Sequence, residues 1–501
     1  MKVEPDRVGG FPFRKADPDK RRDGFSEVQQ PYSEEEAMKE AERCLLCGTP
    51  VCIDACPVLL DVRGMNEAVA RGDFKTAHER IRETNPLIGV TARCCPQLSG
   101  LCEDACVLRW SGQPIGIGLI QRYVADWERK NSGKDTLPTV AKDSGKKVSV
   151  IGAGPSGLAA AELLRRYGHA VTVYDELPLA GGTARYGIPD YHLPKDVLQH
   201  EVDRIVSMGV TIKNGVRVGG NNSGDVSLDA LVDESDAVLI TTGSRDPIKL
   251  RCQGADLKGV MSGYDFLRDV FSNGLDNYLR NPKYELGRDI IVVGGGDSAL
   301  DCARTALRLS DGGNVTVAYR RTEADMPADP IMLEEAHEEG VRFLYLAEPK
   351  AFEGSGKVTT AVFDTMEMGP PDESGRSKPE AVPGKEFRLD CSSVLMAIGR
   401  GPNSFLQKNV PKLETGEKGA IAIGDHHETS IPGVFASGDV TTGETLVVKA
   451  MASGRDGAQR VHEYLMKVPE GQHLSFYEKY YLGRSYDRMM EGLSGMGAPP
   501  A

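Results

Sequence analysis

The sequence predicts two α/β units, each built on a parallel sheet, and a helical domain that precedes them. Two glycine-rich stretches, each between a β-branched run and an Ala- and Leu-rich run, predict the two α/β units. Eight of the eleven cysteines fall between residues 44 and 106 and set that region apart. With 501 residues, the chain is long enough for two or three domains with ordinary cores.

The composition is that of a soluble globular protein, with 40% hydrophobic and 27% charged residues. No apolar stretch approaches the roughly 20 residues of a membrane helix. The polar amino terminus lacks the apolar core of a signal peptide, so we expect a cytoplasmic protein without a membrane partner. A net charge of −13 and an aromatic content of 6% argue against nucleic-acid binding.

A short helix is predicted immediately before the cysteines, in "YSEEEAMKEAERC". Ser33 is the expected N-cap, and Glu36 three residues later completes a capping box. This helix leads the chain into the first cysteine run.

The cysteine runs are compatible with three chemistries: disulfides, zinc and iron–sulfur clusters. Disulfides are rare in a reducing compartment. Zinc sites usually use two close pairs separated by a longer loop, whereas these runs resemble those of ferredoxins, in which a proline follows the last cysteine. The pattern therefore favours two [4Fe–4S] clusters over zinc or unligated thiols. The residues are Cys44, Cys47, Cys52 and Cys56, followed by Pro57, and then Cys94, Cys95, Cys102 and Cys106.

The number of ligands raises a difficulty. Two clusters of this kind need eight ligands. Cys94 and Cys95 are adjacent, however, and neighbouring residues rarely both point at one cluster. If only Cys95 is a ligand, one cluster lacks a fourth cysteine. The remaining cysteines stand alone and are expected to be buried structural thiols: Cys252, Cys302 and Cys391.

A complete dinucleotide-binding fingerprint follows Lys146. A strand over residues 148–151 leads into three glycines and a helix, and a second strand over 170–174 ends at Asp175, 23 residues after the first glycine. The glycines let the backbone approach a pyrophosphate at the helix N-terminus, and Asp175 is expected to bind ribose hydroxyls. The competing interpretation is a tight strand–helix turn without a ligand. The glycines are Gly152, Gly154 and Gly157.

A second fingerprint lies in "GRDIIVVGGGDSALDCARTALRLSDGGNVTVAYRR", with Gly294, Gly296 and Ala299 at the three key positions. Its second strand ends at Arg320 and Arg321 where the first unit has its acid. Arginines there suit a 2′-phosphate, so NADP(H) is predicted over NAD(H). The competing interpretation is that the two arginines form a solvated strand end.

Two later stretches suggest that the chain leaves the first unit and returns to it. "DAVLITTGS" ends a strand at Gly243, and the chain returns through Gly399 in "VLMAIGRGPN" and then Gly438 and Asp439. A helix beginning near Leu446 follows. Its N-terminus is expected to face the pyrimidine edge of a flavin and stabilise the reduced anion.

Six stretches together carry a resemblance to one family: "CLLCGTPVCIDACP", "VIGAGPSGLAAAELL", "YGIPDYHLPKDVL", "GGGDSALDCARTALRL", "YRRTEADMPA" and "ASGDVTTGE". The chain resembles, over nearly its whole length, the small subunit of bacterial NADPH-dependent glutamate synthase. The same module is similar to the large subunit of NADH-dependent ferredoxin:NADP oxidoreductase and to the amino-terminal half of dihydropyrimidine dehydrogenase.

The resemblance implies three domains. These are a helical domain with two [4Fe–4S] clusters over residues 1–145, an FAD-binding domain over 146–247 and 402–501, and an NADPH-binding domain over 248–401, the last inserted into the second. It also implies the cofactor-binding residues. Those expected for FAD are Gly152, Gly154, Pro155, Ser156, Gly157, Asp175, Gly182, Gly243, Gly438, Asp439 and Leu446; those for NADP are Gly294, Gly296, Asp297, Ser298, Ala299, Arg320, Arg321 and Gly399.

The resemblance further assigns the cluster ligands. One cluster is expected on Cys44, Cys47, Cys52 and Cys106, and the other on Cys56, Cys95, Cys102 and Gln121. Gln121, in "IGIGLIQRY", stands where glutamate synthase small subunits more often carry Glu. A neutral amide leaves a cluster less negative, so its potential is expected to be raised. Cys94 could serve as a ligand in place of Cys95.

Two positions depart from the family pattern. Asp297 stands where relatives often have Asn, and Arg185 stands where they often have an apolar residue, which changes the expected surroundings of the flavin.

The expected function is electron transfer from NADPH through FAD and the clusters to a larger partner subunit. That partner is either a glutamate synthase large subunit or a flavoprotein linked to ferredoxin or NAD, in which case the flavin would bifurcate electrons. The chain could also be a stand-alone NADPH:acceptor reductase or a non-catalytic scaffold. Near the carboxyl end, "FYEKYYLGRSYDRMM" is expected to form a helix packed on its own domain, or else a partner contact, and the tail "EGLSGMGAPPA" is expected to be disordered.

Overall fold

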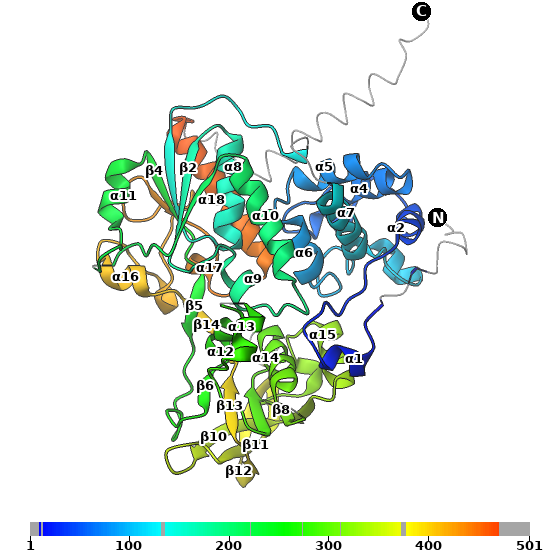
Figure 1. Ribbon diagram of the computed structural model, residues 1–501, viewed down its shortest axis with the longest axis vertical. Coiled ribbons are helices and arrows are strands. Elements are labelled where there is room, and N and C mark those ends of the chain that lie inside the picture. Colours follow the sequence, from blue (N-terminus) through cyan, green and yellow to red (C-terminus); the bar gives the residue numbers. More distant parts are fainter. Residues whose placement is uncertain are drawn as a thin grey trace, which may run out of the picture.

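The computed structural model describes residues 10–11, 14–131, 136–220, 222–272, 274–310, 312–371 and 377–469. Both expectations for the carboxyl end therefore lie outside the described residues. Figure 1 shows three parts: a helical part in blue, an α/β part beside it, and a second α/β part at the lower end of the view.

The helical part begins with the predicted capping box. The Ser33 hydroxyl accepts a hydrogen bond from the Glu36 N–H at 3.3 Å, and the Glu36 carboxylate accepts one from the Ser33 N–H at 2.7 Å. Aspartate side chains cap two later helices by accepting a backbone N–H from the first turn, Asp61 at α4 and Asp73 at α5. The elements are α1 (Pro18–Arg22), α2 (Glu34–Glu42), α3 (Val51–Asp54), α4 (Val62–Ala70), α5 (Phe74–Arg82), α6 (Ile88–Cys94), the 3₁₀ turn η2 (Val107–Ser111) and α7 (Ile117–Asn131).

The first α/β part holds a five-stranded parallel sheet in the order β15-β4-β1-β2-β3. Its strands are β1 (Lys147–Ile151), β2 (Ala170–Asp175), β3 (Thr211–Asn214), β4 (Ala237–Ile240) and β15 (Val434–Ala436). Its helices are α8 (Pro155–Arg166), α9 (Gly182–Tyr186), α10 (Lys195–Ser207), α11 (Leu228–Glu234), α16 (Phe405–Asn409), α17 (Asp439–Thr442) and α18 (Val447–Leu465), with the turn η5 (Glu417–Gly419). Because β15 completes a sheet begun by β1, distant segments of the chain share one core.

The second α/β part repeats the arrangement in the order β6-β13-β7-β8-β9, again parallel. Its strands are β6 (Val260–Ser262), β7 (Asp289–Val293), β8 (Asn314–Tyr319), β9 (Arg342–Tyr345) and β13 (Ser393–Met396). Its helices are α12 (Gly263–Phe271), α13 (Leu275–Arg280), α14 (Asp297–Leu309) and α15 (Pro330–Glu338), with the turn η4 (Glu323–Asp325). An antiparallel sheet of β10 (Ala347–Glu353), β11 (Thr360–Pro371) and β12 (Ser377–Asp390) extends it.

Two kinds of connection join the second α/β part to the rest. The short antiparallel pair of β5 (Ser244–Pro247) and β14 (Arg400–Pro402) carries the chain out and back. In addition, α1 lies against α15 in Figure 1, and the buried Arg21 guanidinium pairs with Glu338 and Glu339 at 2.6 and 2.9 Å. The amino-terminal segment therefore contacts the second part directly.

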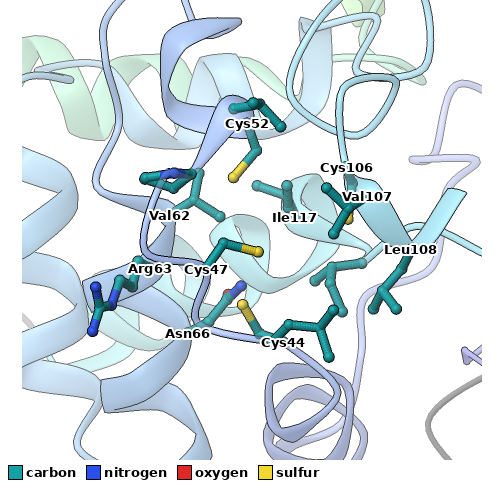
Figure 2. Close-up of a pocket in the computed structure, with 14 residues that line it drawn as sticks. Cys44, Cys47, Cys52, Val62, Arg63, Asn66, Cys106, Val107, Leu108 and Ile117 are labelled. Atoms are coloured by element: carbon teal, nitrogen blue, oxygen red, sulfur yellow. The ribbon is translucent and has the colours of Figure 1, made fainter. Parts of the chain in front are cut away.

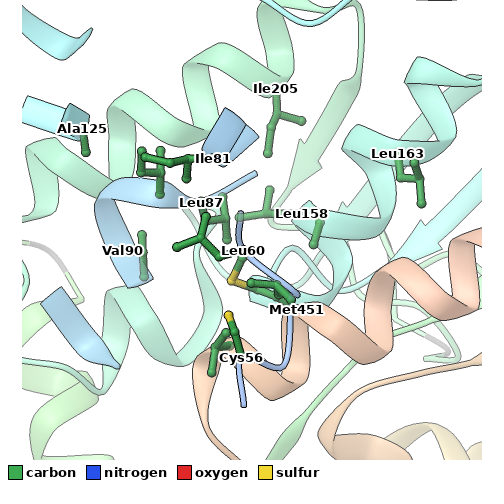
Figure 3. Close-up of a cluster of buried hydrophobic side chains, with 14 of the residues drawn as sticks. Cys56, Leu60, Ile81, Leu87, Val90, Ala125, Leu158, Leu163, Ile205 and Met451 are labelled. Atoms are coloured by element: carbon green, nitrogen blue, oxygen red, sulfur yellow. The ribbon is translucent and has the colours of Figure 1, made fainter. Parts of the chain in front are cut away.

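One hydrophobic core spans the helical part and the first sheet. Figure 3 shows Cys56 and Leu60 of the helical part beside Met451 of α18, with Leu158 of α8 in the same cluster. All four are buried. Packing at this density fixes the helical part against the first sheet.

The isolated cysteines follow the expectation in part. Cys302 and Cys391 are buried, but Cys252 is only partly covered, so its assignment as a buried thiol was wrong. It lies on the edge of a core cluster in the loop after β5, where one side faces solvent.

Candidate functional site

The first candidate site is a pocket in the helical part whose lining includes four cysteines (Figure 2). Cys44 and Cys47 lie in the loop after α2, Cys52 lies on α3, and Cys106 lies directly before η2. Leu46, between the first two, has a φ of 48°, a left-handed conformation that turns the loop sharply. The structure thus brings together the four thiols expected to hold one cluster.

The electrostatics of this pocket favour a cationic occupant. Burial, together with the nearby thiols of Cys106, Cys44 and Cys47, raises the pKa of the Cys52 thiol to about 12. Four adjacent thiolates are unfavourable without a compensating charge, and metal binding drives their deprotonation. The donor set therefore fits an iron–sulfur cluster.

A second set of thiols lies in the same core, with Cys56 and Cys102 buried and Cys95 partly covered. Burial raises the pKa of Cys95 and of Cys102 well above the usual value, and the Cys56 thiol adds to the shift of both. Cys56 also has its pKa raised by burial, while the backbone N–H groups of Leu60, Val58 and Leu59 point at its sulfur and lower it. Amide donors of this kind suit a thiolate that ligates a cluster.

The structure separates the adjacent cysteines Cys94 and Cys95. Burial raises the pKa of Cys94 to about 12, and its nearest charges are Lys195, which lowers it, and Asp301. Cys95, by contrast, is coupled to Cys56. This arrangement favours Cys95 as the ligand.

Gln121 is buried on α7, and Cys95 lies at the end of the neighbouring helix α6. Its amide nitrogen donates to the Thr91 hydroxyl at 2.7 Å and to the Ile88 carbonyl at 3.4 Å. The Cys95 N–H in turn bonds the Thr91 carbonyl at 3.0 Å. Because α6 holds the amide nitrogen, the amide oxygen is the atom that remains available to bind iron. An oxygen ligand suits the role expected of Gln121.

The first fingerprint forms a glycine-walled cradle at the N-terminus of α8. Gly152 has a φ of 108°, and a Cβ there would lie 2.5 Å from the Thr241 carbonyl oxygen. A Cβ on Gly157 would lie 1.9 Å from the Gly152 oxygen, so helix and strand meet too closely for any side chain. Gly154 faces Gly182, whose Cβ would lie 2.7 Å from the Gly154 Cα. Pro155 begins the helix at its first turn.

Beside this cradle lies a second pocket, of about 410 Å³, which includes Gly152 and Asp175. The buried Asp175 carboxylate accepts hydrogen bonds from the Ala153 and Leu177 N–H groups at 2.6 and 2.8 Å, and burial raises its pKa. The Thr242 hydroxyl and the Arg245 Nε are buried here with no hydrogen-bond partner. Unpartnered polar atoms at this place fit a nucleotide.

The other residues expected in the first unit lie around the same strand ends. The Asp439 backbone carbonyl accepts a bond from Ser244 at 3.0 Å, and its carboxylate accepts one from Thr445 at 2.6 Å. Burial raises the pKa of Asp439. Leu446 is the N-cap residue of α18 and Gly438 that of α17, and Gly243 has open space around it. The Ser156 hydroxyl, close to Gly438, is buried and unpartnered.

The second fingerprint repeats the cradle at the N-terminus of α14. A Cβ on Gly294, whose φ is 145°, would lie 2.2 Å from the Ala397 carbonyl oxygen. At Gly296 the nearest atom to a Cβ is 3.9 Å away, so space is open there. Ala299 is fully buried against the strand, and Ser298 is exposed. Gly399 lies next to strand β14 with a φ of 105°, and a Cβ there would lie 3.4 Å from the Ile248 side chain.

The polar residues of the second unit differ in their exposure and in their hydrogen-bond partners. Arg320 is exposed and pairs with Glu348 at 3.3 Å, whereas the Nε of the partly covered Arg321 is buried and unpartnered. The Asp297 carboxylate accepts a bond from the Asp329 N–H at 2.7 Å, and burial raises the pKa of Asp297 to about 6. Asp297 therefore bonds to protein backbone at the start of α14.

Arg185 does not face the open cradle. It is buried, and it bonds the Ala180 carbonyl and the Gln199 amide oxygen, the latter at 2.7 Å. Its long side chain therefore packs α9 against α10.

Sequence reasoning missed several polar residues around these sites. Arg217 and Arg245 both pair with Glu176 at 2.6 Å beside the second pocket. Lys195 is partly covered and interacts electrostatically with Cys94, and desolvation lowers its pKa. Arg400 binds Glu444 and the Thr183 hydroxyl, and so links the β5–β14 pair to α9. Lys195 falls within "YGIPDYHLPKDVL" and could have been found there, but the others depend on tertiary contacts.

Comparison with known proteins assigns the chain to a family. Residues 146–454 match the family described as pyridine nucleotide-disulphide oxidoreductase. The chain belongs to this family. It is accordingly an oxidoreductase, and residues 20–133 match a second family, described as dihydropyrimidine dehydrogenase domain II, 4Fe-4S cluster.

Relatives within this family cover most of the chain. The glutamate synthase [NADPH] small chain of Escherichia coli is 35% identical and covers 89% of this chain and 95% of its own length. The putative oxidoreductase AegA of E. coli is 37% identical over 90% of this chain and 70% of its own. The NADP(+)-dependent formate dehydrogenase subunit beta of Moorella thermoacetica is 37% identical over 83% and 60%. The predicted resemblance to glutamate synthase small subunits is confirmed.

Among solved structures, FprA from Mycobacterium tuberculosis has the same fold over part of the chain, with a TM-score of 0.54 at 19% identity. It covers 68% of this chain and 89% of its own. In the described ranges, no helix is both long enough and apolar enough to span a bilayer. Within those ranges, no group of three or more His, Cys, Asp or Glu is arranged around a single metal ion.

Proposed function

We propose that this oxidoreductase is an electron-transfer subunit that takes electrons from NADPH and passes them through FAD and two [4Fe–4S] clusters to a partner protein. The observation that carries the proposal is the pocket of four thiols in the helical part, which shares one core with the sheet that bears the first glycine cradle. The match of residues 20–133 to a 4Fe-4S family supports it.

The proposed domains follow the strand order. Residues 1–145 are the cluster domain, 146–247 with 402–501 the FAD domain, and 248–401 an NADPH domain inserted into the FAD domain. The insertion is supported because β15 joins the sheet of β1 to β4, while β6, β7, β8, β9 and β13 form a second parallel sheet and β10 to β12 an antiparallel one.

FAD is assigned to the first unit. The glycines of the cradle would admit the pyrophosphate against the N-terminus of α8, and the pocket at Asp175 would hold the adenosine. Two further residues prepare this site: Arg245 supplies an unpartnered buried donor, and Leu446 caps a 19-residue helix whose N-terminal dipole favours negative charge.

NADPH is assigned to the second unit. Gly296 leaves open space at the N-terminus of α14, and Arg321 offers a buried donor without a partner. A guanidinium suits a 2′-phosphate.

When bound, the nucleotides and clusters supply hydride and single-electron chemistry, and the protein supplies position and electrostatics. Cys56 of the second thiol set lies beside Met451 of α18, and both belong to the shared core shown in Figure 3. No side chain is proposed as a general acid or base.

The cluster ligands are assigned in two groups. The first group is Cys44, Cys47, Cys52 and Cys106, and the second is Cys56, Cys95, Cys102 and Gln121. The pocket supports the first group, and the mutual electrostatic coupling of the buried thiols supports the second.

The proposed partner is a glutamate synthase large subunit, because three relatives are glutamate synthase [NADPH] small chains with over 90% of their own lengths covered. A second candidate is an NADPH:acceptor reductase with a different partner, because other relatives are named as subunits of a formate dehydrogenase and of an NADPH-Fe(3+) oxidoreductase. We place the protein in the cytoplasm, where its thiols stay reduced.

The function is tested by measuring NADPH oxidation by the purified chain, first with a one-electron dye and then with a glutamate synthase large subunit, glutamine and 2-oxoglutarate. Dye reduction together with glutamate formation supports the first candidate. Dye reduction without glutamate supports the second candidate. Failure to oxidise NADPH with either acceptor would reject both.

A further inference from the structure

Asn66 is an unusual residue in the pocket of four thiols. Apart from the cysteines, the lining is apolar except for Arg63 and Asn66. Asn66 lies on α4 and has 0% exposure. It occupies the buried face of that helix, one turn after Val62 and directly after the buried Met65. An amide in such a place needs an explanation, because buried positions on a helix are usually apolar.

The side chain of Asn66 has no hydrogen bond. Both its Nδ2 and its Oδ1 are buried without a partner. An amide buried in this way is destabilising by about 1–3 kcal/mol unless a partner is supplied. Figure 2 shows the amide pointing into the pocket, beside the sulfur atoms of Cys44 and Cys47.

The position of α4 leaves Asn66 little freedom to point elsewhere. Asp61 caps the helix by accepting the Gly64 N–H at 3.1 Å, and a Cβ on Gly64 would clash with that carboxylate. Met65 and Val69 anchor the same helix in the shared core. The helix is therefore fixed, and the amide is directed at whatever fills the pocket.

We propose that Asn66 donates an amide hydrogen to a sulfur of the cluster held by Cys44, Cys47, Cys52 and Cys106. The inference rests on the proposed function, since it needs that cluster. Reduction adds negative charge to the cluster sulfurs, so an N–H donor stabilises the reduced form more than the oxidised form and raises the potential. Asn66 thereby makes this cluster easier to reduce than it would be without the amide, and does so without being a ligand.

The test is an EPR-monitored redox titration of the intact chain carrying Asn66→Leu, which keeps the shape but removes the donor. We expect one cluster to become about tenfold harder to reduce, a fall of about 59 mV for one electron, while the other cluster is unchanged. Ile117→Val is the matched control, because Ile117 lines the same pocket and contributes only packing. Asn66→Ser, which restores a donor, should recover part of the shift.

A second measurement does not depend on the redox titration. Resonance Raman spectra of the wild-type chain in D₂O should show shifted Fe–S stretching bands, and the Asn66→Ser chain should show smaller shifts. Potentials in Asn66→Leu equal to those in Ile117→Val would overturn the inference, as would an equal shift of both clusters. Absence of iron and sulfide from the wild-type chain would instead reject the proposed function.

Discussion

Gly294 and Gly296 stand two residues apart in the second cradle but differ in the space around them. Gly296 has φ −99° and ψ 178°, which an alanine can adopt, and its Cβ would project into open space. Gly294 has a φ of 145° and a backbone oxygen 2.2 Å from its Cβ position. Gly294 is therefore required by the fold, whereas Gly296 is not, which is consistent with its proposed role in binding the nucleotide.

This contrast gives a prediction. Gly296→Ala should leave the melting temperature unchanged and weaken NADPH binding by about tenfold, because the methyl group occupies the path of the phosphates. Gly294→Ala should lower the free energy of unfolding by about 1–3 kcal/mol. Calorimetric titration and thermal unfolding measure the two effects. Normal NADPH affinity in Gly296→Ala would show that the phosphates do not cross this glycine.

Arg320 and Arg321 carry the predicted preference for NADPH. Replacing both with Ala should raise the KM for NADPH by about 10- to 100-fold, since charge-assisted hydrogen bonds are lost, and leave that for NADH nearly unchanged. Steady-state kinetics with both nucleotides decide it. Equal effects on the two would assign the arginines to a solvated strand end. Arg321→Ala alone should carry most of the effect, because Arg320 already pairs with Glu348.

The assignment of Gln121 as a cluster ligand can be tested directly by substitution. A thiolate in place of the neutral amide makes the cluster more negative, so Gln121→Cys should lower the potential of one cluster only. EPR-monitored titration resolves the two signals. Cys94→Ser is the control, because Cys94 faces Lys195 and should leave both potentials unchanged. Unaltered potentials in Gln121→Cys would remove Gln121 from the ligand set.

At the scale of elements, a buried carboxylate joins the cluster domain to the first sheet. Glu128 on α7 pairs with Arg204 and, at 2.9 Å, with His200, both on α10. Burial acts to raise its pKa, but the hydrogen bond from His200 and the Arg204 charge outweigh it and hold the pKa at about 2. The ionised form therefore stabilises the contact between these helices.

Glu128→Gln should lower the free energy of unfolding by about 3 kcal/mol at pH 7, since it leaves Arg204 buried without its charge partner. The pKa in the folded state lies below the ordinary value of 4.5, so this stabilisation is present above that value and is lost as the pH falls toward 2. The difference in melting temperature between variant and wild type should accordingly shrink below about pH 4.5. A constant difference down to the lowest accessible pH would contradict this account.

The elements with strong local signals could be predicted from the sequence. The capping box at Ser33 and both strand–glycine–helix units are confirmed by the structure, because caps and tight turns depend on nearby residues. The orphaned amide of Asn66 and the salt bridges of Arg245 and Arg400 could not be predicted, since they depend on which distant segments meet. Cys252 was placed wrongly for the same reason: its exposure depends on how the loop after β5 packs.

At the scale of the whole molecule, the helical part and the first sheet share one hydrophobic core. This shared core supports a continuous electron-transfer path between the proposed cofactor sites. Helices of the cluster domain and α18 of the first sheet contribute to one hydrophobic cluster, so the two sets of thiols keep a fixed position relative to the first cradle. The second α/β part is joined to the rest of the molecule through the antiparallel β5–β14 pair and through α1.

The most direct test of the central claim is an anaerobic titration of the purified chain with NADPH, following flavin absorbance and the EPR signal of reduced clusters in the same sample. Iron and labile sulfide are counted beforehand. The account predicts about eight iron atoms per chain, bleaching of the flavin by NADPH, and single-electron reduction of at least one cluster. Material that bleaches while holding no iron, or that holds iron but does not respond to NADPH, would contradict it.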